Sequence, residues 1–265
     1  MRSNHLKEMC QKQQAVVNGW LTIPSSYAAE VMGHQGFDAV TVDLQHGMVG
    51  FEQAVGMFQA LSATPALPLA RVSWNDPALV MQLLDAGACG IICPMISSVE
   101  EARSFVSACR YPPVGTRSFG PARGLLYGGP DYFEHANDEI LTFAMIETRQ
   151  GLDALDAILA VEGLDGIFVG PNDLSLAMGK APKSEPDDPQ VRAAIAHICA
   201  RTRARGKIPG IFCSGGAAAA RRIAEGFLLV TPGNDVALLS QAARSAVEAT
   251  RGTPSSAKPG AGSGY

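Results

Sequence analysis

The chain alternates short apolar segments with longer amphipathic segments along almost its whole length. Most of the short segments are apolar at every position, whereas a strand exposed on one face would be apolar at every second position. A strand that is apolar throughout is covered on both faces, as the strands of a parallel sheet are. The sequence therefore predicts parallel strands at residues 18–22, 39–44, 67–72, 90–94, 141–147, 166–170, 208–213 and 227–231.

Helical periodicity fills the segments between these strands, at residues 25–35, 51–63, 77–86, 99–109, 151–160, 188–205, 217–225 and 235–250. A further short helix within residues 4–15 is expected to close the bottom of a barrel. Strand and helix alternating eight times predict an α/β fold, the closed (β/α)8 TIM barrel. A doubly wound sheet is the alternative, but no GxGxxG motif follows the first strand.

The 265 residues are 47% hydrophobic and 17% charged, which is enough apolar material for a sizeable core. We expect a single barrel domain over residues 1–250 and a disordered tail over residues 251–265, which are rich in Gly, Pro and Ser. Two strand–helix units are extended, by residues 111–129 and by residues 171–188. Barrel active sites lie at the carboxyl ends of the strands, so the second extension begins on the active-site face.

The net charge of −4 and the lack of a long basic run argue against nucleic acid or a membrane surface as a partner. Lys7 and Glu8 interrupt the segment where a signal peptide would be apolar, so we expect a cytoplasmic protein. The six cysteines form no CxxC pair, a pattern typical of reduced, buried thiols. Cys89 and Cys93 are a weak candidate zinc pair, because no second Cys or His pair follows at a suitable spacing.

Polar side chains stand at the ends of four predicted strands: Asp43 and His46, Arg71, Glu147, and Asp173. Glu147 and Asp173 follow neighbouring strands, so both carboxylates can reach one divalent cation that keeps open positions for a substrate. The alternatives are a salt bridge from Glu147 to Arg149 and a helix N-cap at Asp173. Asp43 can hold one ring nitrogen of His46 and leave the other as a general base, although an exposed loop histidine is the alternative.

Arg71 follows an apolar run, so its guanidinium needs an anion, a carbonyl oxygen, or an ion pair with Asp43 or Glu147. The amides of residues 171–174 lie where a strand turns into a helix and can bind a carboxylate. Neither a Walker loop nor a GxSxG elbow is present, which excludes nucleotide hydrolysis and serine hydrolysis. No lysine ends a predicted strand, which argues against a Schiff-base aldolase.

These residues lie in motifs that resemble the HpcH/HpaI family of metal-dependent class II pyruvate aldolases, in the phosphoenolpyruvate/pyruvate barrel superfamily. The resemblance covers about residues 19–240 and rests on VDLQHG, RV, PM, YPPVGTRSFG, MIET, DGIFVGPNDLS and GND, in the family's order. It implies that Glu147 and Asp173 bind Mg²⁺, Mn²⁺ or Co²⁺. It also implies that Arg71, Gly170, Asn172 and Asp173 bind the keto acid. His46, oriented by Asp43, is implied to handle the hydroxyl proton, with Arg71 and the metal stabilising an enolate.

The expected reaction is reversible cleavage of a 4-hydroxy-2-oxo acid to pyruvate and an aldehyde. Gln45 and Met145 depart from the family pattern, in which many members carry Glu and Gln there, so the aldehyde preference does not transfer. The resemblance also implies a homo-oligomer, a hexamer built as a trimer of dimers, in which Asp85 can reach a neighbour's site. Arg123 is a further candidate for a carboxylate of the acceptor, with a solvated arginine as the alternative.

Three other functions remain open at this point. The same enolate could come from decarboxylation of oxaloacetate, as in the related macrophomate synthase, and then His46 would be dispensable. A barrel that binds a keto acid without turnover belongs to another class, but it would not need the metal, base and arginine positions together. An enzyme acting on coenzyme A esters, like a citrate lyase, would need a basic patch that the sequence does not show.

Overall fold

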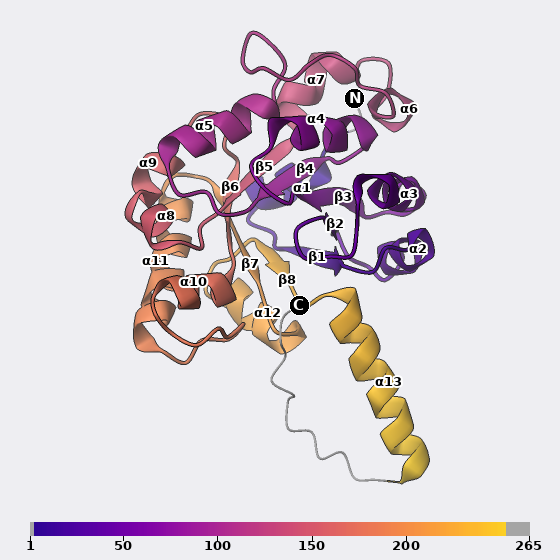
Figure 1. The fold of residues 1–265 in the computed structure, drawn as a ribbon, viewed down its shortest axis with the longest axis vertical. Helices are drawn as coiled ribbons and strands as arrows, with labels where there is room; N and C mark the ends of the chain where they lie inside the picture. The colour runs from indigo at the N-terminus through magenta and orange to yellow at the C-terminus, as the bar shows by residue number, and fades with distance from the viewer. Residues whose placement is uncertain (1–2, 253–265) are drawn as a thin grey trace.

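The computed structural model describes residues 3–252. Its eight strands are all parallel and form a closed barrel, in which each strand pairs with the next and β8 pairs with β1 (Figure 1). The predicted TIM barrel is therefore confirmed. The strands are β1 (Val16–Leu21), β2 (Ala39–Asp43), β3 (Leu67–Arg71), β4 (Gly90–Cys93), β5 (Leu141–Met145), β6 (Gly166–Val169), β7 (Ile208–Phe212) and β8 (Leu229–Thr231).

Helices lie at every predicted position, with small shifts at their ends. They are α1 (His5–Gln11), α2 (Ser26–Gly33), α3 (Phe51–Leu61), α4 (Pro77–Ala86), α5 (Val99–Ala108), α8 (Arg149–Asp153), α9 (Leu155–Leu159), α11 (Pro189–Ala204), α12 (Gly216–Ala224) and α13 (Asp235–Arg251). The helix predicted over residues 151–160 is divided at Ala154 into α8 and α9. Arg251, placed in the tail by the sequence, ends α13, and the rest of that predicted tail from residue 253 lies outside the described residues.

Two hydrophobic clusters account for the core. One lies between the barrel and the surrounding helices, and the other fills the barrel interior. The interior cluster includes Leu6 and Cys10 of α1, so this helix closes the bottom of the barrel as predicted. A layer of hydrogen-bonded polar side chains also spans the interior. The side chain of Asn18 donates to the Thr231 hydroxyl at 2.9 Å and accepts from the Thr41 hydroxyl at 3.0 Å.

The first extended unit packs on the outside of the barrel near its bottom. It contains two helices that the periodicity did not predict, α6 (Gly124–Gly128) and α7 (Tyr132–Glu139). The Arg117 guanidinium donates to the Asp85 carboxylate at 2.6 Å, at the end of α4 that leads into the bottom of β4. The Arg123 guanidinium donates to the Ala86 carbonyl oxygen at 2.7 Å in the same region. This extension therefore lies away from the carboxyl ends of the strands.

Helix α13 points away from the barrel, as Figure 1 shows in yellow. Asp235 is its one buried residue. The Asp235 carboxylate accepts hydrogen bonds from the Thr22 amide and hydroxyl, at 2.9 and 2.7 Å, and from the Ile23 amide at 3.0 Å. The Asn234 side chain caps the same end by accepting from the Ala237 amide. The amino end of α13 is thus attached to the carboxyl end of β1.

Within residues 3–252, no helix is long and apolar enough to cross a membrane.

We predict that Asp235→Ala lowers the free energy of unfolding by about 3 kcal/mol, because it leaves buried donors of Thr22 and Ile23 without their charged acceptor. Urea denaturation followed by circular dichroism measures this change. Asp156→Ala is the control, since that carboxylate is exposed and bonds only across the surface to Arg201 in the contacts we describe. Equal loss of stability in the two variants would contradict the role assigned to Asp235.

Candidate active site

Asp43 and Arg71 face each other as paired residues at the ends of β2 and β3. Arg71 donates twice to the Asp43 carboxylate, from Nε at 2.8 Å and from Nη2 at 2.6 Å. Both residues are buried, with exposed fractions of 0% for Asp43 and 1% for Arg71. The interior ion pair that the sequence left open for Arg71 is therefore present, with Asp43 as its partner.

Trp20 of β1 completes this cluster, although the sequence analysis did not single it out. Its indole Nε1 donates to the Asp43 carboxylate at 3.2 Å, and the Arg71 guanidinium lies over the indole ring at 4.8 Å. The ring also contacts Phe168 and Phe212 at centroid distances of 5.6 and 5.4 Å. A tryptophan inside a barrel strand needs a partner for its N–H, and that need is the signal that could have identified it.

The Asp43 carboxylate also organises the loop that carries His46. Its Oδ1 accepts from the backbone amides of Gln45 at 3.0 Å and His46 at 3.3 Å. Burial raises the pKa of Asp43, but the hydrogen bonds and charge of Arg71 outweigh burial, so the pKa lies below its ordinary value. Asp43 is therefore ionised at neutral pH. These contacts fix the backbone of His46, and the orientation of its ring by Asp43 stays a prediction.

The imidazole of His46 lies within the electric field of the same cluster. Burial lowers its pKa, and the positive charge of Arg71 lowers it further. The carboxylates of Asp43 and Asp173 act in the opposite direction but do not reverse the shift. His46 is therefore mostly neutral at pH 7, the state in which an imidazole can accept a proton.

Glu147 lies just beyond β5 with only 3% of its surface exposed. Its Oε1 accepts from the Met95 amide at 2.8 Å. Met95 has φ of 60°, a left-handed conformation that is uncommon for a residue other than glycine. This strained backbone aims the N–H at the carboxylate. The MIET and PM motifs were both visible in the sequence, but nothing in the sequence indicates the contact between them.

The carboxylate of Glu147 is poorly compensated in its buried position. Burial raises its pKa, and although the Met95 amide lowers it, the negative charge of Asp173 raises it again, to a value of about 7. The charge of the Arg71 guanidinium also lowers the pKa of Glu147, but this is the smallest of the four effects. A side chain at Gly170 would collide with Oε2 of Glu147, so the backbone at the end of β6 leaves room for this carboxylate.

Asp173 lies in the first turn of α10 (Pro171–Ala177), a helix that begins directly after β6. Its N-cap is Gly170, so the alternative that made Asp173 the N-cap is wrong. The Asn172 side chain donates to the Ser184 hydroxyl at 3.4 Å. A shallow hollow joins these residues to the arginine and aromatic cluster. It is lined by Arg71, Met145, Phe168, Gly170, Pro171, Asn172, Asp173 and Phe212.

Glu147 and Asp173 are the two carboxylates at this end of the barrel that could bind a metal ion. In residues 3–252 no group of three or more His, Cys, Asp or Glu side chains is arranged to hold one. A hard divalent cation bound here would therefore keep most of its coordination positions for water or substrate oxygens, as Mg²⁺ commonly does. Cys93 is buried in the core cluster and burial raises the pKa of its thiol, so Cys89 and Cys93 do not resemble a zinc pair.

The two residues suggested for contacts beyond this hollow lie elsewhere. Asp85 is bonded to Arg117, and Arg123 to Ala86, both on the outside of the barrel near its bottom. Arg123 therefore does not line the hollow of its own chain, and it is bonded to the protein, so the solvated arginine is not what the structure has.

Of the two residues that depart from the family pattern, Met145 lines the hollow. The Oε1 atom of Gln45 is buried without a hydrogen-bond partner among the described residues.

Comparison with known proteins identifies the family of the chain. Residues 18–242 match the family described as HpcH/HpaI aldolase/citrate lyase. A hydroxypyruvate/pyruvate aldolase of Rhizorhabdus wittichii is 42% identical over 94% of this chain and 99% of its own length. A 4-hydroxy-2-oxo-heptane-1,7-dioate aldolase of Salmonella dublin is 39% identical over 91% of this chain and 92% of its own length.

Solved structures show the same fold. A member of this family from Burkholderia cenocepacia superimposes with a TM-score of 0.87, at 30% identity over 94% of this chain and all of the other. Macrophomate synthase superimposes with a TM-score of 0.83, at 25% identity over 94% of this chain and 88% of the other. The resemblance expected from the motifs is confirmed. The chain belongs to the HpcH/HpaI aldolase/citrate lyase family and is an aldolase-type lyase.

Proposed function

We propose that the protein is a divalent-metal-dependent aldolase that reversibly cleaves a 4-hydroxy-2-oxo acid to pyruvate and an aldehyde. The observation that carries this proposal is the buried Glu147 carboxylate, whose pKa is raised to about 7 beside the negative charge of Asp173. Two carboxylates at adjacent strand ends repel each other unless a cation lies between them. The names of the two aldolase relatives support the class of substrate.

The residues present fit a divalent cation. Gly170 leaves space beside Oε2 of Glu147, and the donors are carboxylate oxygens, which Mg²⁺ and Mn²⁺ prefer. When bound, the metal would supply Lewis-acid stabilisation of negative charge developing on the substrate's keto oxygen. Mg²⁺, Mn²⁺ and Co²⁺ are the candidates.

Arg71 and the first turn of α10 bind the keto acid in this proposal. Asp43 holds the guanidinium of Arg71 in one orientation by two bonds, so Arg71 can donate to the keto oxygen without reorganising. The amides of Asn172 and Asp173 lie in the first turn of a helix, where they have no acceptor within the helix and can donate to the substrate carboxylate. Phe168 and Phe212 are apolar residues that line the hollow.

His46 acts as the general base. Its lowered pKa keeps it neutral at pH 7, so it can take the proton from the 4-hydroxyl of the substrate. The C3–C4 bond then breaks, the aldehyde leaves, and the electron pair forms an enolate whose oxygen receives a hydrogen bond from Arg71. A proton from solvent water adds to C3 and yields pyruvate, and the protonated His46 releases its proton to solvent. In the opposite direction, His46 returns the proton to the new hydroxyl.

A second candidate is the decarboxylation of oxaloacetate to the same enolate. It is supported by the structural likeness to macrophomate synthase, at 25% identity. Loss of a carboxyl group needs the residues that stabilise the enolate but needs no base for a hydroxyl proton. The two reactions therefore differ in their dependence on His46.

We predict that pyruvate release from 4-hydroxy-2-oxo acids stops with EDTA and returns with added Mg²⁺, Mn²⁺ or Co²⁺. His46→Ala should lower kcat by at least about a hundredfold, the usual contribution of a general base. A coupled lactate dehydrogenase assay measures both effects, with His34→Ala, an exposed histidine on α2's carboxyl end, as the control. If oxaloacetate alone yields pyruvate and His46→Ala is unaffected, the decarboxylase is the correct reading.

A stability measurement tests the electrostatic cost of Glu147 separately. Between pH 4.5 and about 7 the carboxyl group of the folded protein stays protonated while that of the unfolded chain ionises. The folded state therefore loses stability as pH rises through this window, and the loss is constant above it. Without metal, Glu147→Gln should raise the free energy of unfolding at pH 8 by about 3 kcal/mol.

Urea denaturation in EDTA at pH 8 and about one pH unit below the unfolded-state pKa of 4.5 measures this difference, which should be nearly absent at the lower pH. The variant should also lose the metal-dependent activity. A Glu147→Gln protein that is less stable than wild type at pH 8 would show that the buried charge of Glu147 does not destabilise the folded state.

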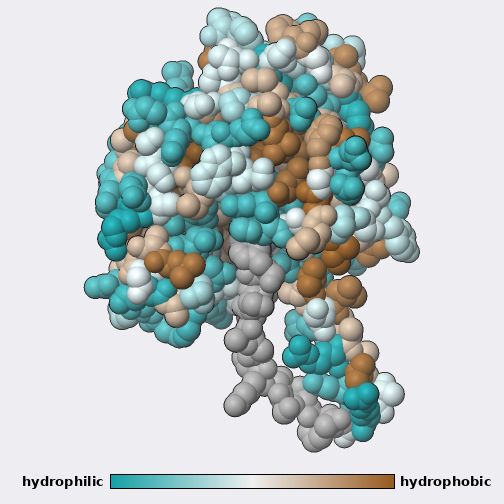
Figure 2. All heavy atoms as spheres, in the orientation of Figure 1, coloured by the Kyte–Doolittle hydropathy of each residue, from teal (hydrophilic) through white to brown (hydrophobic). Residues whose placement is uncertain are grey.

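We further propose that the protein is a homo-oligomer, a hexamer built as a trimer of dimers. The supporting feature is α13, which has exposed apolar side chains along a helix that leaves the barrel (Figures 1 and 2). Leu239 is 62% exposed, and Val236, Leu238 and Val247 are also exposed. A helix with this much apolar surface is stabilised by packing against another subunit.

Leu239→Asp should shift the protein to a smaller species in sedimentation velocity, because it places a charge in the proposed contact. Gln241→Asp, two residues along the same helix and therefore on another face, should leave the sedimentation coefficient unchanged. A wild-type protein that sediments as a single chain at micromolar concentration would refute the oligomer.

A further inference from the structure

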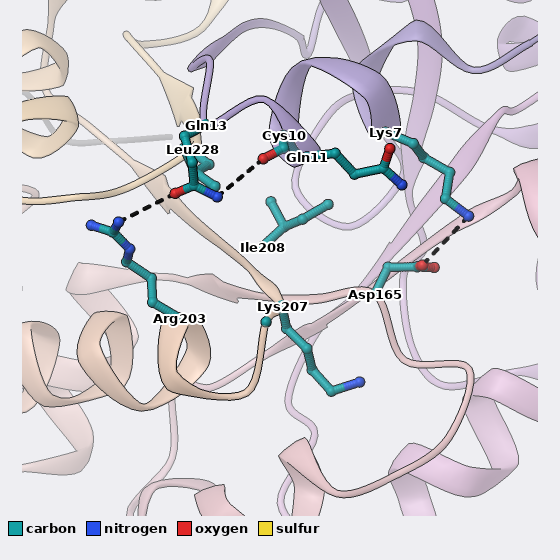
Figure 3. Close-up of a pocket in the computed structure, with 10 residues that line it drawn as sticks. Lys7, Cys10, Gln11, Gln13, Asp165, Arg203, Lys207, Ile208 and Leu228 are labelled. Atoms are coloured by element: carbon teal, nitrogen blue, oxygen red, sulfur yellow. Dashed lines mark hydrogen bonds and ion pairs between the residues drawn. The ribbon is translucent and has the colours of Figure 1, made fainter.

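A hollow lies at the bottom of the barrel, at the opposite end from the candidate active site. It has a volume of about 380 Å³ and lies between α1, the turn from α11 to β7, and the residues that precede β6 and β8 (Figure 3). A hollow of this size can hold a small metabolite. No residue of the candidate active site lines it.

Three basic side chains line the hollow: Lys7, Arg203 and Lys207. One carboxylate lines it as well, Asp165. Asp165 already accepts hydrogen bonds from Arg110 at 3.1 Å and from the Thr142 amide at 2.8 Å, and Arg110 is almost fully buried behind it. The negative charge of Asp165 is therefore largely compensated by Arg110, and the hollow is positive in a chain whose net charge is −4.

Most contacts of the three basic groups are with neutral acceptors. Arg203 donates to the Gln13 side chain at 3.2 Å, and Lys207 donates to the Leu164 carbonyl oxygen. Lys7 donates to the Asp138 carbonyl oxygen, and its ammonium group is 3.9 Å from Asp165. Neutral acceptors and one shared carboxylate do not balance three positive charges, so an anion in the hollow would gain charge-assisted hydrogen bonds.

The floor of the hollow is apolar. Figure 3 shows Ile208 between Arg203 on one side and Lys7 on the other, and Leu228 also lines the hollow. Inorganic anions would leave this floor uncovered, whereas a compound with a short carbon skeleton would cover it. The arrangement therefore favours an organic anion over a simple ion.

We propose that this hollow binds a small organic anion, attracted by the positive charges of Lys7, Arg203 and Lys207, with its carbon skeleton on Ile208 and Leu228. Asp165 and Lys207 directly precede β6 and β7. The opposite ends of those strands carry Gly170 and Phe212 of the candidate active site. The site is thus separate from the proposed catalytic residues, and it stands whether or not the proposed reaction is correct.

Isothermal titration calorimetry of the whole chain with phenyl phosphate, benzoate and inorganic phosphate tests the proposal. Phenyl phosphate or benzoate should bind saturably and more tightly than inorganic phosphate, and whichever of the two binds better identifies the anionic group. Arg203→Gln should weaken that binding at least about tenfold. Arg192→Gln removes the same charge from an exposed position on the same helix and should change it less than about twofold.

Lys7→Gln provides a second variant in case Arg203→Gln does not fold, and it should weaken binding in the same way. Two results would overturn the proposal. One is the absence of saturable binding of either organic anion up to about 10 mM. The other is equal weakening by Arg203→Gln and Arg192→Gln, because binding would then follow the overall charge and not the hollow.

Discussion

The buried pair of Asp43 and Arg71 is the interaction on which the catalytic end of the barrel depends. A single carboxylate binds the arginine of β3, the indole of Trp20 on β1 and the backbone amides that lead to His46. Removing either partner would leave an unpaired charge in the interior, at a cost of about 3–5 kcal/mol. The pair therefore fixes three strand ends and a loop at once, and it holds Arg71 in the orientation that the proposed reaction needs.

Much of the fold follows from the sequence because strands buried on both faces must be apolar throughout, and eight such runs are visible. Residues at the carboxyl ends of those runs or just beyond them were also predictable, since strand ends converge in a barrel. Asp43, Arg71, Glu147 and Asp173 came from that rule alone. The strand ends themselves were less certain: Glu147 was expected inside a strand but lies beyond β5, whose last residue is Met145.

What the sequence could not predict depends on contacts between distant segments. The amide of Met95 meets Glu147 only because the backbone at residue 95 is left-handed. Trp20 could have been a core residue, and its bond to Asp43 appears only when β1 and β2 are paired. The helices α6 and α7 lie in a segment with Gly and Pro, where periodicity is weak, so the position of that extension was open. Arg123 and Asp85 could not be assigned to the outside of the barrel without it.

Helix α13 is attached at one end only. Asp235 binds the backbone at Thr22 and Ile23, immediately after β1, and the remaining length of about 25 Å stands clear of the barrel. The attached end of this helix lies beside the carboxyl end of β1, at the mouth of the barrel. Thr22, to which it is bonded, lies two residues from Trp20. A partner that packs along α13 would therefore be joined to the end of β1 through the bonds of Asp235 to Thr22 and Ile23.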